Sequence, residues 1–279
     1  MSASAQIRRT REKVQEEYGH QKWPAMERLI ADEIEREPDA GLARILYRCA
    51  ASWWRRPEGP LAPRDFVVDG EVVSLPLGGA YGAAQTIILD AVAAATRPDT
   101  DLIVEMGSGW GWHIVTAFTA GGPRDATYVA AEYTEAGRRC AERLAAVDDH
   151  LTLQAIPFDY HEPRFEGLPA ARHAVVFSAH SIEQIPYVKP ELFDAISGLA
   201  DEVTCLHFEP CGWQVGPEHD GRGTSQAYAS EHDYPRNLGP ALREAEADGR
   251  LVIDEVVADV FGINPRNSTT AIRWRKATA

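Results

Sequence analysis

The sequence predicts an α/β fold in which a seven-stranded, mostly parallel sheet follows a helical N-terminal cap. Two observations support this prediction. From residue 101 onward, short apolar runs alternate with amphipathic stretches, which is the pattern of parallel strands joined by crossover helices. Before that point, apolar residues recur mainly at helical spacing. We therefore expect a cap with a short hairpin over residues 1–80 and the main domain over residues 81–279.

The cap begins with two predicted helices. Over residues 5–37, charged and apolar positions alternate at helical spacing, with Pro24 as a break or a first-turn residue. Residues 42–54 form a second amphipathic pattern. Three prolines then predict a loop: Pro57, Pro60 and Pro63.

A hairpin and a joint connect the cap to the main domain. Residues 66–73 contain two short apolar runs separated by Asp-Gly, which is a strong hairpin signal. The glycine-rich run 78–82 should be a flexible joint, and residues 83–95 should form an Ala-rich helix.

The main domain supplies the seven strands. The first five are expected near residues 101–106, 126–132, 151–157, 173–178 and 202–208. A late helix over 240–247 should start at Pro240, because Pro235 and Gly239 argue against an earlier start. Two closing strands are expected over 251–257 and 268–274.

A glycine-rich turn follows the first of these strands. Glu105 ends the apolar run 102–104, and Gly107, Gly109 and Gly111 alternate before a segment that can be helical. A strand, a glycine turn and a helix in this order form a ligand site at the carboxyl end of a sheet. The glycines permit positive φ and close backbone approach, and the helix start offers free N–H donors.

The glycine spacing indicates which ligand this turn binds. A dinucleotide turn requires Gly-x-Gly-x-x-Gly, and its third glycine position holds Trp112 here. The observed Glu-x-Gly-x-Gly-x-Gly resembles the first motif of class I S-adenosylmethionine-dependent methyltransferases. This resemblance implies a Rossmann-like fold, S-adenosylmethionine as cofactor, and a methionyl site formed by Glu105 and the three glycines. A glycine-rich turn without a ligand remains the alternative.

Two acids after the next strands complete the expected cofactor site. Glu132 ends a strand, where a carboxylate can accept both ribose hydroxyls, and the resemblance assigns it this role. The resemblance also places Asp159 at the adenine amino group, with Phe158 or Tyr160 against the ring. The alternatives are a surface acid at Glu132 and a loop acid at Asp159.

The resemblance places the loop after the fourth strand near the transferred methyl group. His180 is then the candidate general base, since histidine titrates near neutral pH, and its alternative is a packing role. Ser178 is expected at the cofactor. The residues expected at the methyl acceptor are Tyr81, Glu183, Glu209 and Trp213. No metal site is expected, because the nearby candidates lack ligand spacing: His219, Asp220, His232 and Asp233.

Composition limits the partners. The net charge of −14, from 28 basic and 42 acidic residues, argues against non-specific electrostatic binding to nucleic acid or anionic membrane. No apolar run is long enough to span a bilayer, and no export signal precedes the cap, so a cytoplasmic enzyme is expected. Its four cysteines should be reduced thiols: Cys49, Cys140, Cys205 and Cys211.

The predicted reaction is methyl transfer from S-adenosylmethionine to an oxygen or nitrogen of a small molecule or short peptide. Two other functions stay open. One is a nicotinamide-dependent oxidoreductase, which the residue at 112 disfavours. The other is a non-catalytic binding protein of the same fold. The oligomeric state is not predicted.

Overall fold

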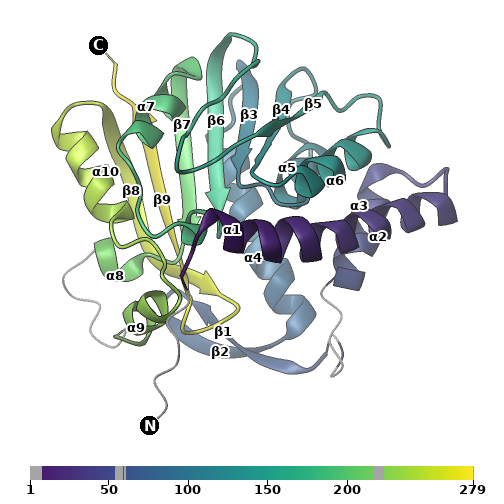
Figure 1. Cartoon of the computed structure of the whole chain (residues 1–279), viewed down its shortest axis with the longest axis horizontal. Coiled ribbons are helices and arrows are strands. Elements are labelled where there is room, and N and C mark those ends of the chain that lie inside the picture. Colours follow the sequence, from purple (N-terminus) through teal and green to yellow (C-terminus); the bar gives the residue numbers. More distant parts are fainter. Residues whose placement is uncertain (1–7, 54–58, 60, 216–222, 279) are drawn as a thin grey trace.

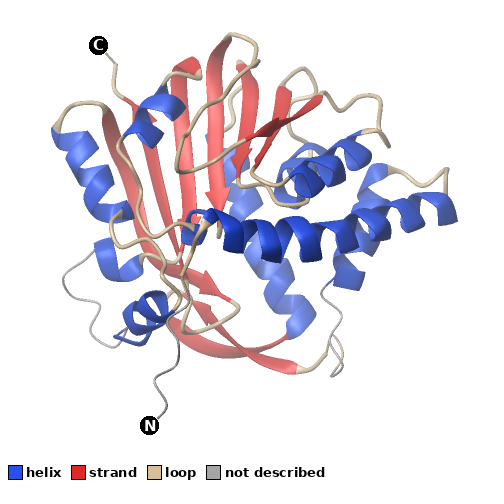
Figure 2. Ribbon diagram, viewed as in Figure 1, coloured by secondary structure: helices blue, strands red, loops and turns tan. Residues whose placement is uncertain are grey.

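The computed structural model describes residues 8–53, 59, 61–215 and 223–278, which form one mixed β-sheet with helices on both faces (Figures 1 and 2). The start of the first predicted helix lies outside the described residues. So do Trp54, the last residue of the second predicted helix, and four residues named above: Pro57, Pro60, His219 and Asp220.

Within the described residues the sheet has nine strands, in the spatial order β2-β1-β8-β9-β7-β6-β3-β4-β5. In chain order they are β1 (Pro63–Val68), β2 (Glu71–Pro76), β3 (Thr100–Met106), β4 (Thr127–Glu132), β5 (Leu153–Pro157), β6 (Ala171–Ala179), β7 (Ala200–Glu209), β8 (Leu251–Gly262) and β9 (Thr269–Lys276).

The central strands are parallel and create a topological switch point. β3 pairs with both β4 and β6, β4 pairs with β5, and β6 pairs with β7. These five strands lie within two residues of the predicted ones, which confirms them. The chain order runs outward from β3 and β6 in opposite directions. Ligands of open α/β sheets bind outside the carboxyl ends of the strands at such a point.

The other strands are antiparallel. β9 pairs with β7 and β8, and the β1–β2 hairpin joins β8 through Val67 and Val68. The prediction of seven mostly parallel strands is therefore wrong, because nine strands are described and four of their eight pairings are antiparallel. The hairpin itself is confirmed, with positive φ at Asp69 and Gly70, but local pattern does not show which sheet edge a hairpin joins. The domain boundary near residue 80 stays a prediction.

The helices cover both faces of the sheet. The described helical segments are α1 (Arg11–Val14), η1 (Gln15–Lys22), α2 (Trp23–Arg36), α3 (Leu42–Trp53), α4 (Leu77–Ala95), α5 (Trp112–Thr119), α6 (Glu135–Ala145), η2 (Ile182–Gln184), α7 (Glu191–Ser197), α8 (Gly212–Val215), α9 (Gly223–Glu231) and α10 (Leu238–Ala247). One buried cluster joins the sheet to the helices from α2 to α6, and a second joins it to α7 and α10. Successive residues of β3 point to opposite faces of the sheet, so Ile103 packs in the first cluster and Leu102 in the second. None of these helices is both long enough and apolar enough to cross a membrane.

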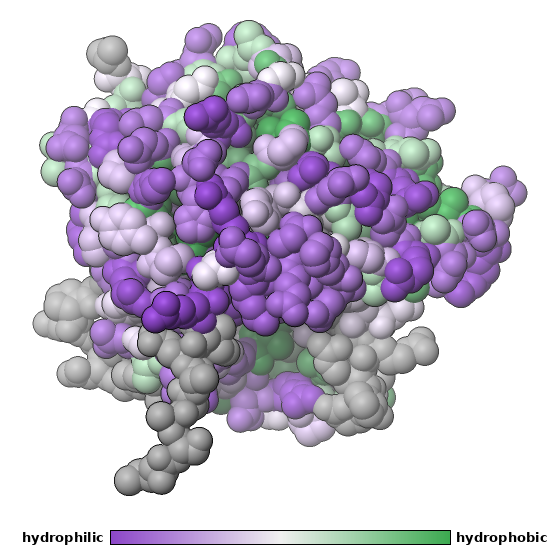
Figure 3. All heavy atoms as spheres, viewed as in Figure 1, coloured by the Kyte–Doolittle hydropathy of each residue, from purple (hydrophilic) through white to green (hydrophobic). Residues whose placement is uncertain are grey.

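The N-terminal helical segment crosses the carboxyl edge of the parallel strands (Figure 1). α1, η1 and α2 follow one another directly, and α2 packs on α6. In η1 the turns are of π type, and the N–H of Trp23 donates to the Tyr18 carbonyl five residues back. Pro24 lies in the first turn of α2, as expected for one of its two predicted roles. The outer face of this segment is mainly hydrophilic (Figure 3).

Two local predictions need correction. The glycine-rich run 78–82 is not a joint but the first part of α4, because Leu77, Ala80 and Ala84 already face the core at helical spacing. Burial of this stripe outweighs the low helix propensity of glycine. α10 starts at Leu238 and not at Pro240. Gly239 is tolerated in its first turn because its N–H donates to the Gln214 side chain at 3.0 Å.

Candidate functional site

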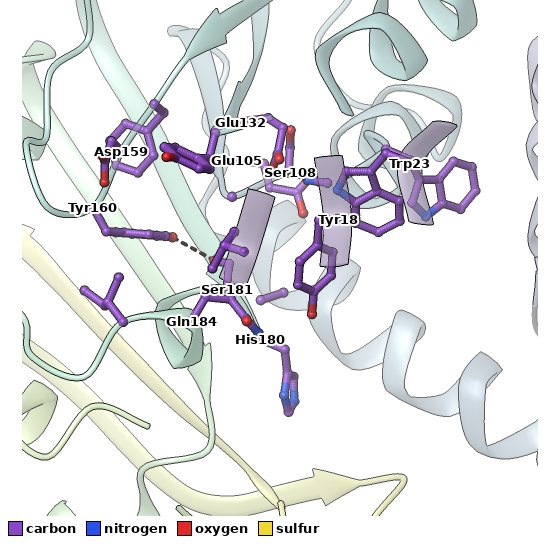
Figure 4. A pocket seen from close by; sticks show the side chains of 18 of the residues that line it. Tyr18, Trp23, Glu105, Ser108, Glu132, Asp159, Tyr160, His180, Ser181 and Gln184 are labelled. Carbon is purple, nitrogen blue, oxygen red and sulfur yellow. Dashed lines mark hydrogen bonds between the residues drawn. The ribbon is translucent and has the colours of Figure 1, made fainter. Parts of the chain in front are cut away.

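A pocket opens at the switch point, between the strand ends and the N-terminal helical segment (Figure 4). The glycine turn after β3, the ends of β4 and β6 and the loop after β5 line it. It brings together six residues predicted for the cofactor or the chemistry: Glu105, Gly107, Gly109, Glu132, Asp159 and His180. We call it the polar pocket. Gly111, predicted with them, lies behind the turn, where an added Cβ would sit 2.9 Å from the Cβ of Ala141 in α6.

The other two glycines are required by close packing inside the pocket. Gly107 has φ +64°, and a Cβ there would lie 2.4 Å from the Cβ of Ser181. Gly109 has φ +56°, and a Cβ there would lie 2.8 Å from the Trp23 indole. Both positions therefore combine left-handed backbone with a neighbour that leaves no room for a side chain.

Glu105 is buried and holds the start of α5. One of its oxygens accepts the backbone N–H of Ile114 at 2.9 Å. The other lies 2.8 Å from Nδ1 of His113. A helix N-terminus is where a bound anion would otherwise find its donors, and here a carboxylate of the chain takes that place.

Glu132 is 5% exposed and braces the glycine turn from the neighbouring strand. Its Oε1 accepts the backbone N–H and the hydroxyl of Thr134, at 2.9 and 2.7 Å. Its Oε2 accepts the N–H of Gly109 at 2.9 Å. Burial raises the pKa of Glu132, against the lowering effect of these donors. Since each carboxylate oxygen has two lone pairs, Oε2 retains one acceptor position that no other described residue uses.

Asp159 is paired with the N-terminal helical segment. Its Oδ2 accepts from Nε of Arg11 at 2.7 Å, and its Oδ1 accepts the N–H of His161 at 2.8 Å. Arg11 also reaches Glu162 at 2.8 Å. The carboxylate predicted to bind adenine thus carries a partner 148 residues away in the chain.

Aromatic side chains form the walls of the polar pocket. Tyr18 and Trp23 lie on one side, and Asp159 and Tyr160 on the other (Figure 4). The Tyr160 hydroxyl donates to the Met106 carbonyl and lies 2.7 Å from Oγ of Ser181. This contact fixes the ring beside the glycine turn.

A second cavity adjoins the polar pocket on the side of α4 and β8. We call it the chamber. The two cavities share four residues, Trp112, His113, Ala179 and His180, so they meet at the start of α5 and the end of β6. The remaining chamber residues are Tyr81, Ala84, Gln85, Ile88, Phe261, Ile263, Asn264 and Asn267. Of the predicted acceptor residues, Tyr81 is the one that lines this space.

His180 lies on this boundary with both ring nitrogens engaged. Nδ1 lies 3.1 Å from Glu183, and Nε2 lies 2.6 Å from the hydroxyl of Thr269. Burial lowers the pKa of His180, but the charge and hydrogen bond of Glu183, with a contribution from Glu209, raise it overall. Its backbone has φ +50°. The proposed role of this histidine as a base stays a prediction.

The structure does not bring the other predicted residues into either cavity. Ser178 is fully buried, with its hydroxyl 3.0 Å from Nδ1 of His207. Glu183 lies behind His180, and Trp213 belongs to α8. Glu209 is fully buried and accepts the N–H groups of residues 181 and 182 at 3.2 and 3.1 Å. Glu209 is enclosed because the loop after β6 folds over the end of β7.

Sequence reasoning missed two parts of the site. The first is the N-terminal helical segment, whose Arg11, Tyr18 and Trp23 line the polar pocket. Nothing in its local pattern identifies the pocket it crosses. The second is His113, directly after the glycine turn. A titratable side chain in the first turn of that helix was a signal that could have found it.

Among the described residues, no group of three or more His, Cys, Asp or Glu side chains is arranged to hold a metal ion. The four cysteines are buried free thiols, as the sequence predicts.

No protein family model and no curated protein matches the chain. Similar solved structures include geranyl diphosphate methyltransferase in complex with GPP and sinefungin, at 16% identity over 73% of this chain and 80% of that chain, with a TM-score of 0.46. Magnesium protoporphyrin IX methyltransferase (ChlM) from Synechocystis PCC 6803 with bound SAH matches at 11% identity over 71% and 84%, with a TM-score of 0.46. LepI in complex with SAM matches at 13% identity over 68% of this chain and 46% of that chain, with a TM-score of 0.43. None of these three scores reaches 0.5, so these similarities by themselves do not identify the function of the chain.

Proposed function

We propose that the protein is an S-adenosylmethionine-dependent methyltransferase that methylates an oxygen or nitrogen of a small molecule or short peptide. The observation that carries this proposal is the arrangement of three carboxylates around the glycine turn at the switch point. Glu105, Glu132 and Asp159 all line the polar pocket, and Arg11 is its one lysine or arginine among the described lining residues.

This charge distribution suits the proposed cofactor. S-adenosylmethionine carries a sulfonium and an ammonium group against one carboxylate, so its net charge is positive. A nicotinamide dinucleotide instead carries a pyrophosphate, which needs the N–H donors of the helix start. Glu105 already accepts a hydrogen bond from one of these donors, the N–H of Ile114. Its own negative charge would also repel the pyrophosphate. The site therefore favours the sulfonium cofactor over the dinucleotide.

The residues present can each serve one part of the cofactor. Glu105, Gly107 and Gly109 would hold the methionyl part, and the open acceptor position on Glu132 would take a ribose hydroxyl. Asp159, with Tyr160 and Phe158 beside it, would bind adenine once the contact with Arg11 loosens or rearranges.

The chamber is the proposed acceptor side. Bound S-adenosylmethionine would supply an electrophilic methyl group. The chain would align an acceptor atom with it, and such alignment can supply much of the rate acceleration. The chamber supports this assignment because it meets the polar pocket at four shared residues.

Calorimetry with S-adenosylhomocysteine and with NAD tests the cofactor assignment. We expect micromolar or tighter binding of S-adenosylhomocysteine and no binding of NAD. Binding of NAD without binding of the sulfur compound would overturn the proposal. Transfer of a labelled methyl group to any acceptor would then distinguish the enzyme from a non-catalytic binding protein.

A further inference from the structure

Two histidines stand at the boundary between the polar pocket and the chamber, and they differ in what their ring nitrogens contact. His113 and His180 line both cavities. Nδ1 of His113 lies 2.8 Å from Glu105, while Nε2 has no hydrogen-bond partner among the described residues. Both nitrogens of His180 are engaged. Only His113 therefore has a ring nitrogen that remains available to a ligand.

The contact with Glu105 determines the form of the His113 ring. The carboxylate accepts a hydrogen bond, so the proton of the neutral imidazole is placed on Nδ1 and the lone pair on Nε2. Glu105 is itself fixed by the backbone of α5 through Ile114. An imidazole oriented by a carboxylate is the arrangement that prepares histidine to take up a proton, because the same carboxylate stabilises the imidazolium.

The residues that line the chamber indicate which kind of acceptor molecule would donate that proton. Among its described lining residues there is no Lys, Arg, Asp or Glu. Aromatic and aliphatic surface dominates, from side chains such as Tyr81, Ile88 and Phe261. Polar contacts come from amides, and Nε2 of Gln85 has no hydrogen-bond partner in the part of the chain that the structure describes. Such a space favours an uncharged, largely apolar molecule with a few hydrogen-bonding groups, because its two histidines, His113 and His180, are already paired with Glu105 and Glu183.

We propose that His113, oriented by Glu105, takes the proton from the hydroxyl of an uncharged aromatic or apolar acceptor bound in the chamber. This inference rests on the proposed function. The acceptor oxygen forms a bond to the methyl carbon as the carbon–sulfur bond breaks, and the electron pair of that bond stays on sulfur. The hydroxyl proton passes to Nε2 of His113 and later to solvent. Glu105 is a positioning residue in this step, and His180 helps to shape the boundary.

The tautomer of His113 tests the inference without any acceptor or cofactor. In protein labelled with ¹⁵N-histidine, long-range ¹H–¹⁵N correlation spectra distinguish Nδ1–H from Nε2–H, and His113→Gln assigns the signal. We expect the neutral ring to carry its proton on Nδ1, and Glu105→Gln to raise the Nε2–H population. A neutral His113 with its proton on Nε2 would overturn the proposal, because the base position would already be filled.

Comparing the binding of neutral and charged probes tests whether the chamber selects an uncharged acceptor. The probes are 2-naphthol, 2-naphthoate and 2-naphthylmethylammonium, titrated into protein saturated with S-adenosylhomocysteine while the His113 signals are followed. We expect 2-naphthol to shift these signals and to bind at least about tenfold more tightly than either ion. Tighter binding of an ion, or no shift with any probe at millimolar concentration, would overturn the assignment. Failure of S-adenosylhomocysteine to bind would instead count against the proposed function, and the tautomer result would be unaffected.

The largest expected effect is on the rate of 2-naphthol methylation in variants of His113. General-base catalysis contributes ~10²–10⁴-fold, so His113→Gln should lose turnover by this factor while keeping its affinity for S-adenosylhomocysteine. Added imidazole should restore part of the activity of His113→Ala. His150→Gln, at an exposed position outside both cavities, is the matched control and should keep the wild-type rate. Methylation by His113→Gln at the wild-type rate would overturn the proposal.

Discussion

Glu132 and Glu209 look alike in the sequence and behave differently in the structure. Each is the last residue of a strand, β4 and β7 respectively, and both strands end at the same edge of the sheet. Glu132 lines the polar pocket and braces the glycine turn. Glu209 is completely buried, and its Oε2 has no partner among the described residues. An acid at a strand tip becomes a binding group only when the loops around it leave it open.

The loops explain the difference. After β4 the chain turns directly into α6, whose N-cap residue Thr134 holds one oxygen of Glu132 and leaves the other facing the pocket. After β6 the chain folds over the end of β7, and Ser181 anchors this fold by donating to the Met106 carbonyl at 2.8 Å. Glu209 is enclosed beneath that fold. The three predictions below test this contrast, in order of decreasing effect.

The largest effect is expected for the pH dependence of stability at Glu209. Burial raises its pKa to about 7, with His180 opposing and Glu183 adding to the shift. A raised carboxyl pKa stabilises the protein fully below the unfolded value near ~4.3, and this stabilisation is lost as the pH rises through 7. Between those limits wild type should lose roughly 3 kcal/mol from this group. Glu209→Gln keeps an acceptor oxygen for the loop N–H groups and cannot ionise.

Urea unfolding of both proteins from pH 4 to 8 measures this effect. The free energy of unfolding of the variant, minus that of wild type, should increase across this range. Because His180 and Glu183 neighbour Glu209, His180→Gln serves as a control for their share of the change. A difference that stays constant with pH would mean that Glu209 titrates as an ordinary exposed acid.

A smaller effect is expected for cofactor affinity at Glu132. A hydrogen bond to a charged group is worth ~1.5–3 kcal/mol, so Glu132→Ala should weaken S-adenosylhomocysteine binding roughly 10–100-fold. Asp159→Ala should weaken S-adenosylhomocysteine binding less than Glu132→Ala does, since it removes one contact with adenine. Glu209→Gln is the matched control and should bind almost like wild type. Calorimetry gives the affinities, and the melting temperature without ligand shows whether the Gly109 turn is retained. Equal affinity of a folded Glu132→Ala protein and wild type would remove Glu132 from the site.

The smallest effect is expected for cofactor affinity at Arg11, which lines the polar pocket together with Glu132. Its pair with Asp159 is partly exposed, so it is worth at most ~1 kcal/mol. Arg11→Ala should free the carboxylate and tighten S-adenosylhomocysteine binding by up to about fivefold. The same change in an Asp159→Ala background should have no effect. Weaker binding by Arg11→Ala would show instead that the arginine contacts the cofactor.

Local sequence was sufficient to predict the parallel strands, the Asp-Gly hairpin and the glycine turn. Strands and turns of this kind depend on side-chain period and on residues that permit positive φ, such as Gly107 and Gly109, and both are written in short stretches of chain. The positions of Glu105, Glu132 and Asp159 after predicted strands, together with the family resemblance of the glycine motif, predicted these three acids. They line one pocket because strand ends share one edge.

Contacts between distant parts of the chain decided the rest. The hairpin joins β8 through residues almost 200 positions away, which made a sheet of nine strands instead of seven. Arg11 reaches Asp159, and the loop at Ser181 encloses Glu209. Each outcome depends on which surfaces meet when the layers pack, and a local pattern of apolar and polar residues does not specify the partner of a polar side chain.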